Sequence, residues 1–211
     1  MAQATLPRDD AHGGHDEHGA HARPQTNTGT TNPKLAMWVF LASECLFFGA
    51  FIATFLLYRG KSVKGPTPKD VLNIPFTSVT SFILLMSSLT MVLALAAIQR
   101  GDHRRFRVWV MATALFGLTF ISGQIYEFTE FFRKGLSLKT NVFGSSFFVL
   151  TGIHGAHVTV GIIWLLSLWG LSLQGKLHVQ NSEAVEIAGL YWHFVDVVWI
   201  VIFTVVYLIP K

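Results

Sequence analysis

The stretch at residues 38–55, WVFLASECLFFGAFIATF, contains a single charged side chain, that of Glu44. With its flanks it forms an apolar run over residues 35–58, and about 20 helical residues suffice to cross about 30 Å of hydrocarbon. Lipid offers no water to the backbone N–H and C=O groups, so a run of this kind has to satisfy them within a helix. The stretch therefore predicts a transmembrane α-helix and an integral membrane protein.

Four more runs of similar length follow this first one. They cover residues 74–98, 106–131, 142–173 and 184–209. The connections GKSVKGPTPKD, QRGDHRR and RKGLSLKTN are short and basic, which favours antiparallel packing of successive helices. Aromatic rings that prefer the membrane interface lie near the predicted ends: Trp38, Tyr58, Trp109, Tyr126 and Tyr207. The fold class we expect is an all-α bundle of five transmembrane helices over residues 34–211.

The composition excludes an ordinary soluble domain. Of the 211 residues 51% are hydrophobic and only 13% are charged, and the mean hydropathy is +0.47. Soluble domains carry about 25% charged residues. The net charge of +4 comes without a basic patch interleaved with aromatic residues, so we expect contact with membrane lipid and no nucleic acid.

Residues 1–33 form a polar, glycine-rich and histidine-rich tail that we expect to be disordered. The tail has no apolar stretch with a small-residue cleavage site, so it is not a secretory signal. His12, His15, His18 and His21 recur at every third position and could hold a metal loosely. The single cysteine, Cys45, lies within the first apolar run, where we expect it to be a small packed residue.

Several polar and ionisable side chains lie inside the predicted spans, where each is costly unless it has a partner. Residues three or four apart share one face of a helix, so these groups are expected to point inward and meet across helices. Gly152 and Ala156 form a small-xxx-small step beside the histidines, with Gly155 and Gly161 nearby, which would allow close approach. The expected interhelical polar seam consists of Gln124, Glu127, His154, His157, His193 and Asp196, with Glu130 at a helix end and Glu44 alone on its helix.

Three interpretations of these groups remain open. Carboxylates and imidazoles could bond one another and set the register of the bundle. Glu44 has no ionisable neighbour within one turn of its own helix, so burial would favour its protonated form and suit a proton relay or a contact with a partner protein or lipid. In a different class, His154, His157 and His193 could bind a metal or a haem in a membrane metalloenzyme or cytochrome, although no HExxH motif is present.

The orientation in the membrane does not follow from charge. With five spans, the 16 lysines and arginines divide equally between the two sides, so the positive-inside rule makes no choice.

Several blocks in order along the chain resemble subunit III of the haem–copper terminal oxidases. They are WVFLASECLFFGAFIATF (38–55), GPTPKD followed by NIPF, GQIYEF (123–128), GSSFFVLTGIHGAHVTVG (144–161) and YWHFVDVVWIVIFTVVY (191–207). The resemblance runs from about Lys34 to the C-terminus. It implies an accessory, non-redox subunit of a bacterial aa3-type oxidase that reduces oxygen to water while protons are translocated, with cytochrome c as the preferred electron donor and a quinol oxidase as the alternative.

The resemblance also implies partners and site residues. A subunit III holds no haem or copper itself; it contacts subunit I, which holds those cofactors, with subunit II and a small subunit IV nearby. Glu44 matches the family's carbodiimide-reactive carboxylate, linked to proton uptake, and His154, His157, His193 and Asp196 match its motif positions. The family's arrangement places the N-terminus in the cytoplasm and the C-terminus outside, in the bacterial plasma membrane.

This chain differs from many family members in the helices that border bound lipid. Many members have seven helices, of which the first two form one wall of a phospholipid cleft beside a route for oxygen. This chain lacks those two helices, so bound phospholipid is expected but a cleft built by this chain alone is not.

Overall fold

A computed structural model describes residues 29–58, 74–135, 142–177 and 182–209. The histidines of the tail, and with them the predicted disorder and loose metal site, lie outside the described residues. So do most of the residues in two of the three basic connections.

Within the described residues, five helices are long and apolar enough to cross a membrane. They begin and end within a few residues of the predicted spans, so the all-α membrane fold is confirmed. The helices are α1 (Asn32–Tyr58), α3 (Ile74–Gln99), α4 (His103–Arg133), α5 (Val142–Leu173) and α6 (Ser182–Phe203), and α6 continues into a π-helical turn, η2 (Thr204–Leu208).

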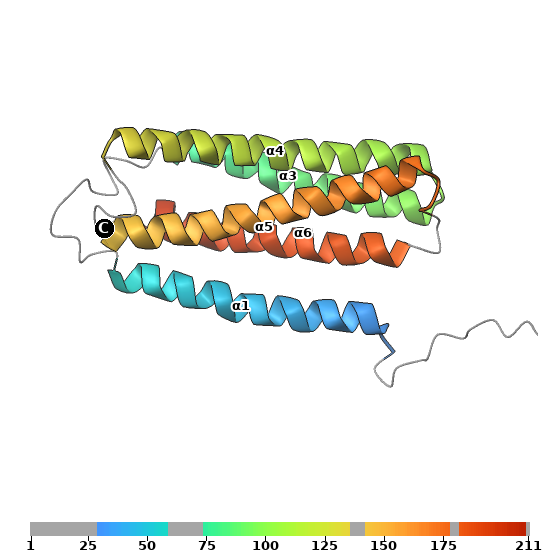
Figure 1. The fold of residues 1–211 in the computed structure, drawn as a ribbon, viewed down its shortest axis with the longest axis horizontal. Coiled ribbons are helices and arrows are strands. Elements are labelled where there is room, and N and C mark those ends of the chain that lie inside the picture. Colours follow the sequence, from blue (N-terminus) through green and yellow to red (C-terminus); the bar gives the residue numbers. More distant parts are fainter. Residues whose placement is uncertain (1–28, 59–73, 136–141, 178–181, 210–211) are drawn as a thin grey trace, which may run out of the picture.

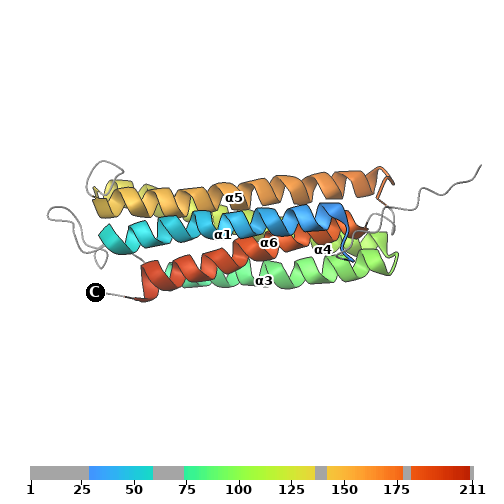
Figure 2. The same cartoon turned by 90° about the horizontal axis from the view of Figure 1, so that it is seen from below.

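The helices run side by side along one axis (Figures 1 and 2). In Figure 1, α3 and α4 lie at one edge, α5 and α6 occupy the middle, and α1 lies at the opposite edge against α5 and α6. A short turn joins α3 to α4. Gly101 adopts a φ of +77° there, and the Asp102 side chain accepts a 3.0 Å hydrogen bond from the backbone N–H of Arg105, which caps α4.

Trp192 of α6 packs closely against two glycines of neighbouring helices. A Cβ on Gly117 of α4 would lie 2.7 Å from its ring, and a Cβ on Gly161 of α5 would lie 2.9 Å from it. Only glycine leaves room for the indole at these two positions. The predicted small-xxx-small step was wrong in its position: a Cβ on Gly152 would meet nothing within 4 Å, and Ala156 is exposed.

Helix α1 is the least buried of the five. In its most apolar window 17% of the residues are buried, against 50% for α6. Its outward face carries large apolar side chains such as Trp38 and Leu46, which suits contact with lipid or another membrane protein. Cys45 lies on this exposed face, so the prediction that it packs inside the bundle was wrong.

Candidate functional site

Glu44 of α1 meets His157 of α5 between the outermost helix and the rest of the bundle. The carboxylate Oε2 lies 3.3 Å from the imidazole Nε2. Both side chains are largely covered, with 16% of Glu44 and 20% of His157 exposed. Sequence reasoning considered only the ionisable neighbours of Glu44 on its own helix, and the partner comes instead from a helix more than 100 residues along the chain.

The hydrogen bond on the other side of the ring decides how this pair carries its proton. Nδ1 of His157 lies 2.8 Å from the backbone carbonyl oxygen of Ile153. A carbonyl can only accept, so Nδ1 holds a proton, and in a neutral ring Nε2 is then an acceptor facing Glu44. A favourable contact needs one more proton between the two groups, either on the carboxyl or on the ring. The geometry therefore leaves room for one proton between Oε2 of Glu44 and Nε2 of His157.

The contact within the pair is loose. At 3.3 Å the two groups satisfy an ion-pair distance, yet Oε2 of Glu44 has no hydrogen-bond partner of good geometry among the described residues. Phe48, which is buried in the bundle, packs edge-on against the His157 ring at 5.0 Å. The Glu44 carboxyl is thus covered without being held by a network of hydrogen bonds.

His154, one turn before His157, has a different environment. It is fully buried, and its ring stacks on Trp199 of α6 at 4.9 Å and meets Phe120 of α4 edge-on at 5.9 Å. Neither ring nitrogen has a hydrogen-bond partner among the described residues. His154 thus sits among aromatic rings and shares no hydrogen bond with the other predicted seam residues in the described part of the chain.

Glu127 of α4 is bonded at both carboxylate oxygens. The Thr77 hydroxyl of α3 donates to Oε1 at 2.7 Å, and the Tyr207 hydroxyl of η2 donates to Oε2 at 3.0 Å. All three side chains are buried. Tyr207 is therefore an interior residue, and the prediction that it belongs to an interfacial aromatic belt was wrong.

His193 and Asp196 of α6 meet through a serine and not directly. The Ser88 hydroxyl of α3 donates to Oδ2 of Asp196, and the Ser88 oxygen lies 3.2 Å from Nδ1 of His193. Oδ1 of Asp196 has no hydrogen-bond partner among the described residues. Ser88 is therefore the residue on which this contact between α3 and α6 depends.

The remaining predicted polar residues lie on α4. The amide of Gln124 donates to the backbone carbonyl of Thr151 at 2.8 Å, and its Oε1 fills the space where a Cβ on Gly155 would stand. Glu130 pairs with Lys134 at 3.9 Å near the end of the helix. Gln124 thus joins α4 to α5, and Glu130 faces out of the bundle, as expected from its position.

The predicted seam is therefore several small sites on different helix pairs. Sequence reasoning missed the hydroxyl partners Thr77 and Ser88, because serine and threonine are common in transmembrane helices and bond their own backbone. The dipeptide Ser87-Ser88 in the middle of an apolar run was the one available signal. Both serines contact α6: Ser88 donates to Asp196, and Ser87 accepts a 2.9 Å hydrogen bond from the indole N–H of Trp192.

The three histidines proposed for a metal or haem do not come together. His154 faces Trp199, His157 faces Glu44 and His193 faces Ser88. Across the described part of the chain, no group of three or more His, Cys, Asp or Glu side chains is arranged to hold a metal ion.

The family model for cytochrome c oxidase subunit III matches residues 16–210 of this chain. The chain belongs to this family. The match includes all five spans, Glu44 and every residue of the sites described above.

Curated relatives agree with the family model and cover nearly the whole chain. Cytochrome c oxidase subunit 3 of Bacillus sp. strain PS3 is 38% identical over 84% of this chain and 86% of its own length. Quinol oxidase subunit 3 of Bacillus spizizenii is 39% identical over 92% of this chain and 96% of its own. Cytochrome bo(3) ubiquinol oxidase subunit 3 of Pseudomonas aeruginosa is 36% identical over 99% and 98%.

Family membership and the five spans together make this chain a multi-pass protein of a bacterial membrane and the third subunit of a haem–copper oxidase complex. The complex is an oxidoreductase, and other oxidase subunits are partners of this chain by definition. The relatives include both cytochrome c oxidases and quinol oxidases.

Proposed function

We propose that this chain is the non-redox subunit III of an aa3-type respiratory oxidase, which reduces oxygen to water while protons are translocated. In this role the chain stabilises subunit I and supports proton uptake and the access of lipid and oxygen. Family membership supports the assignment to the complex. The Glu44–His157 pair supports the role in proton uptake, and it is the observation on which the proposal rests.

The argument from the pair is physical. A carboxyl and an imidazole that share one proton can pass it on with little movement, because the carboxylate oxygen and the ring nitrogen already lie 3.3 Å apart. Their partial exposure leaves the pair open to groups outside this chain. Glu127, by contrast, is held by two hydroxyl donors and has no such freedom.

The test replaces the carboxyl by its amide. In the E44Q variant, proton uptake by the intact complex should slow severalfold or the complex should inactivate after fewer turnovers, while its haem spectra stay unchanged. The H157Q variant should show the same defect, and the double variant should be no worse than either single one, because the two residues act as one unit. Proton uptake is followed with a pH dye in vesicles during oxygen consumption.

The matched control is E130Q, which also removes one carboxylate from this chain. Glu130 lies near a helix end beside Lys134, away from the pair, so E130Q should behave as the unaltered protein. Altered haem spectra in E44Q would mean a structural defect in the complex. Additive defects in E44Q and H157Q would mean that the two residues do not share a proton.

The absence of redox cofactors in this chain is part of the proposal. The separate contacts of His154, His157 and His193 support it, because the described residues bring no three metal-ligating side chains together. Haem and copper are then held by the partner subunits. The chain released from the complex should show no Soret absorption and no stoichiometric iron or copper, and either finding would favour the metalloprotein alternative.

Cytochrome c is our proposed electron donor. A quinol is the second candidate, and a specific observation favours it: the two quinol oxidase relatives above match a larger share of this chain than the cytochrome c oxidase relative does. The purified complex should oxidise reduced cytochrome c faster than a quinol. The opposite preference would assign the chain to a quinol oxidase.

The proposed arrangement in the membrane puts the N-terminus in the cytoplasm and the C-terminus outside, with subunit I as the main contact and subunits II and IV nearby. The exposed apolar face of α1 is suited to such a contact or to lipid. A periplasmically active phosphatase fused after Lys211 should be active, and a fusion before Met1 should not. Chemical cross-links from this chain should fall mainly on subunit I.

A further inference from the structure

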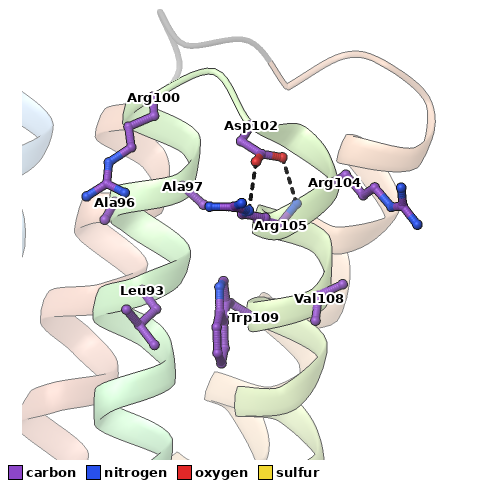
Figure 3. Close-up of a pocket in the computed structure, with 9 residues that line it drawn as sticks. All are labelled: Leu93, Ala96, Ala97, Arg100, Asp102, Arg104, Arg105, Val108 and Trp109. Atoms are coloured by element: carbon purple, nitrogen blue, oxygen red, sulfur yellow. Dashed lines mark hydrogen bonds and ion pairs between the residues drawn. The ribbon is translucent and has the colours of Figure 1, made fainter.

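The end of the α3–α4 hairpin contains an open pocket of about 830 Å³ (Figure 3). The part of the pocket further from the α3–α4 turn is apolar and is lined by Leu93, Val108 and Trp109 (Figure 3). Its outer part carries the guanidinium groups of Arg100 and Arg105. A pocket of this size falls in the range of about 300–1,000 Å³ usual for small-molecule sites.

The spacing of residues along α3 and α4 places the apolar side chains and the arginines in separate parts of the pocket. Leu93 lies seven residues before Arg100, two turns along α3, so both point to the same side. On α4, Trp109 follows Arg105 by four residues, which places the Cα of Arg105 about 6 Å nearer the turn along the helix axis than the Cα of Trp109. The tight turn at Gly101 brings the two arginines to the same end of the hairpin.

The charge of the pocket is mostly unneutralised. Nε of Arg105 lies 3.2 Å from Oδ2 of Asp102, which leaves its other N–H groups unused by that ion pair. The side chains of Arg100 and Arg104 have no ion pair or hydrogen bond with another described residue, and Arg104 points away from the other lining side chains in Figure 3. The pocket thus carries the guanidinium groups of Arg100 and Arg105 against the single carboxylate of Asp102, and an anion is the complementary ligand.

The apolar part of the pocket indicates what kind of anion would bind there. Val108 is 61% exposed and Trp109 is half-buried on the membrane-spanning part of α4, where an indole marks the interface. A free anion or an acidic peptide would use only the basic outer part. A phospholipid uses both parts, because its charged head group and its acyl chains have the same order along the membrane normal as the two parts of the pocket.

We propose that this pocket binds one anionic phospholipid. The phosphate lies on Arg100 and Arg105, and the glycerol and first acyl carbons lie against Trp109, Val108 and Leu93. The site is on the α3–α4 edge of the bundle, away from α1 and the Glu44–His157 pair, and the proposal does not depend on the role of that pair or on the electron donor.

The first test counts bound lipid on the intact complex. The detergent-solubilised complex is stripped of lipid, titrated with dioleoyl phosphatidylglycerol or dioleoyl phosphatidylcholine, and measured by native mass spectrometry. R100Q and R105Q should each weaken phosphatidylglycerol binding at one site about fivefold, the effect of one arginine near a charged lipid. The double variant should lose one phosphatidylglycerol, and phosphatidylcholine binding should not change.

The matched control is R133Q, which removes an exposed arginine at the opposite end of α4. It should bind phosphatidylglycerol as the unaltered complex does. Equal phosphatidylglycerol binding by the double variant and the unaltered complex would overturn the proposal, and so would an equal loss in R133Q.

A second test keeps both arginines and so does not depend on how the variants assemble. A photoreactive maleimide is attached to a cysteine at Val108 (V108C), in a C45A background because Cys45 is exposed. Irradiation of the complex in membranes containing phosphatidylglycerol should give an adduct with the mass of a phospholipid. An adduct with a peptide of another oxidase subunit would overturn the proposal and assign the pocket to a protein contact.

Discussion

Two carboxylates within the membrane-spanning helices show how differently one bundle can treat the same functional group. Glu127 lies between α3, α4 and η2, and hydroxyl donors bond both of its oxygens. Glu44 lies on the outermost helix, and its side chain forms an ion pair with His157 that is 3.3 Å long and off hydrogen-bond alignment. A carboxylate bonded at both oxygens fixes helices in place, whereas a loosely paired one adds little to holding its helix.

The difference follows the burial of the helices. Around Glu127 three elements meet, so donors approach the carboxylate from two sides. Around Glu44 only the inner face of α1 is covered, and few side chains can reach it. The well-packed region of α3 to α6 should therefore respond to mutation by losing stability, and the α1 region by changing activity. Four predictions test this contrast, in order of decreasing effect.

The largest effect should come from G161V. A Cβ at this position would lie 2.9 Å from the Trp192 ring, and overpacking a tight interior costs about 1–3 kcal/mol or more. The recovery of intact complex on native gels should fall sharply. The matched control is G152V on the same helix, where a Cβ would meet nothing within 4 Å. Equal recovery of the two variants would contradict the close contact at Trp192.

The S88A variant should come next. It removes the hydroxyl that donates to Asp196, whose other oxygen already lacks a partner among the described residues, and an unsatisfied buried group costs about 1–3 kcal/mol. The apparent Tm of the complex should drop. H193L should lower it less, because the bond from Ser88 to Asp196 remains. A larger drop in Tm for H193L than for S88A would show that His193, and not Ser88, holds α6 to α3.

The Y207F variant should have a smaller effect. It removes one of two donors to Glu127 and leaves the Thr77 hydroxyl in place, so we expect a loss of about 1 kcal/mol, the usual net value of one hydrogen bond. This loss of stability is measured as a drop in the apparent Tm of the complex. Y126F is the control, because Tyr126 is exposed and should tolerate the change. A destabilisation of Y126F equal to that of Y207F would remove the distinction between the two tyrosines.

The smallest effect should come from E186Q on α6, which removes a contact with the first turn of α1. Lys34 of α1 pairs with Glu186 of α6, and both side chains are about a third exposed, so the pair should contribute less than about 1 kcal/mol. We expect faster hydrogen exchange in the first turns of α1 with an unchanged Tm. High salt should abolish the difference, since exposed ion pairs are screened. A lower Tm at all salt concentrations would mean that α1 is as firmly held as the other helices.

Some features of this fold could be predicted from the sequence and others could not. The five spans and their ends were predictable, because crossing hydrocarbon sets a minimum length of apolar residues that a linear sequence displays directly. The costly groups inside them, from Glu44 to Asp196, were predictable for the same reason. The face of α1 that carries Cys45 was not, because its almost uniformly apolar sequence does not reveal which side meets the bundle.

The sequence by itself determined the number of spans, the membrane environment and the ionisable residues that must find partners within it. Only the tertiary structure decided the partners: His157 for Glu44, Tyr207 and Thr77 for Glu127, and Ser88 for Asp196. The physical reason is that hydropathy is a property of each residue along the chain. A hydrogen bond between helices depends on their rotation and offset, which the contacts of all five helices set together.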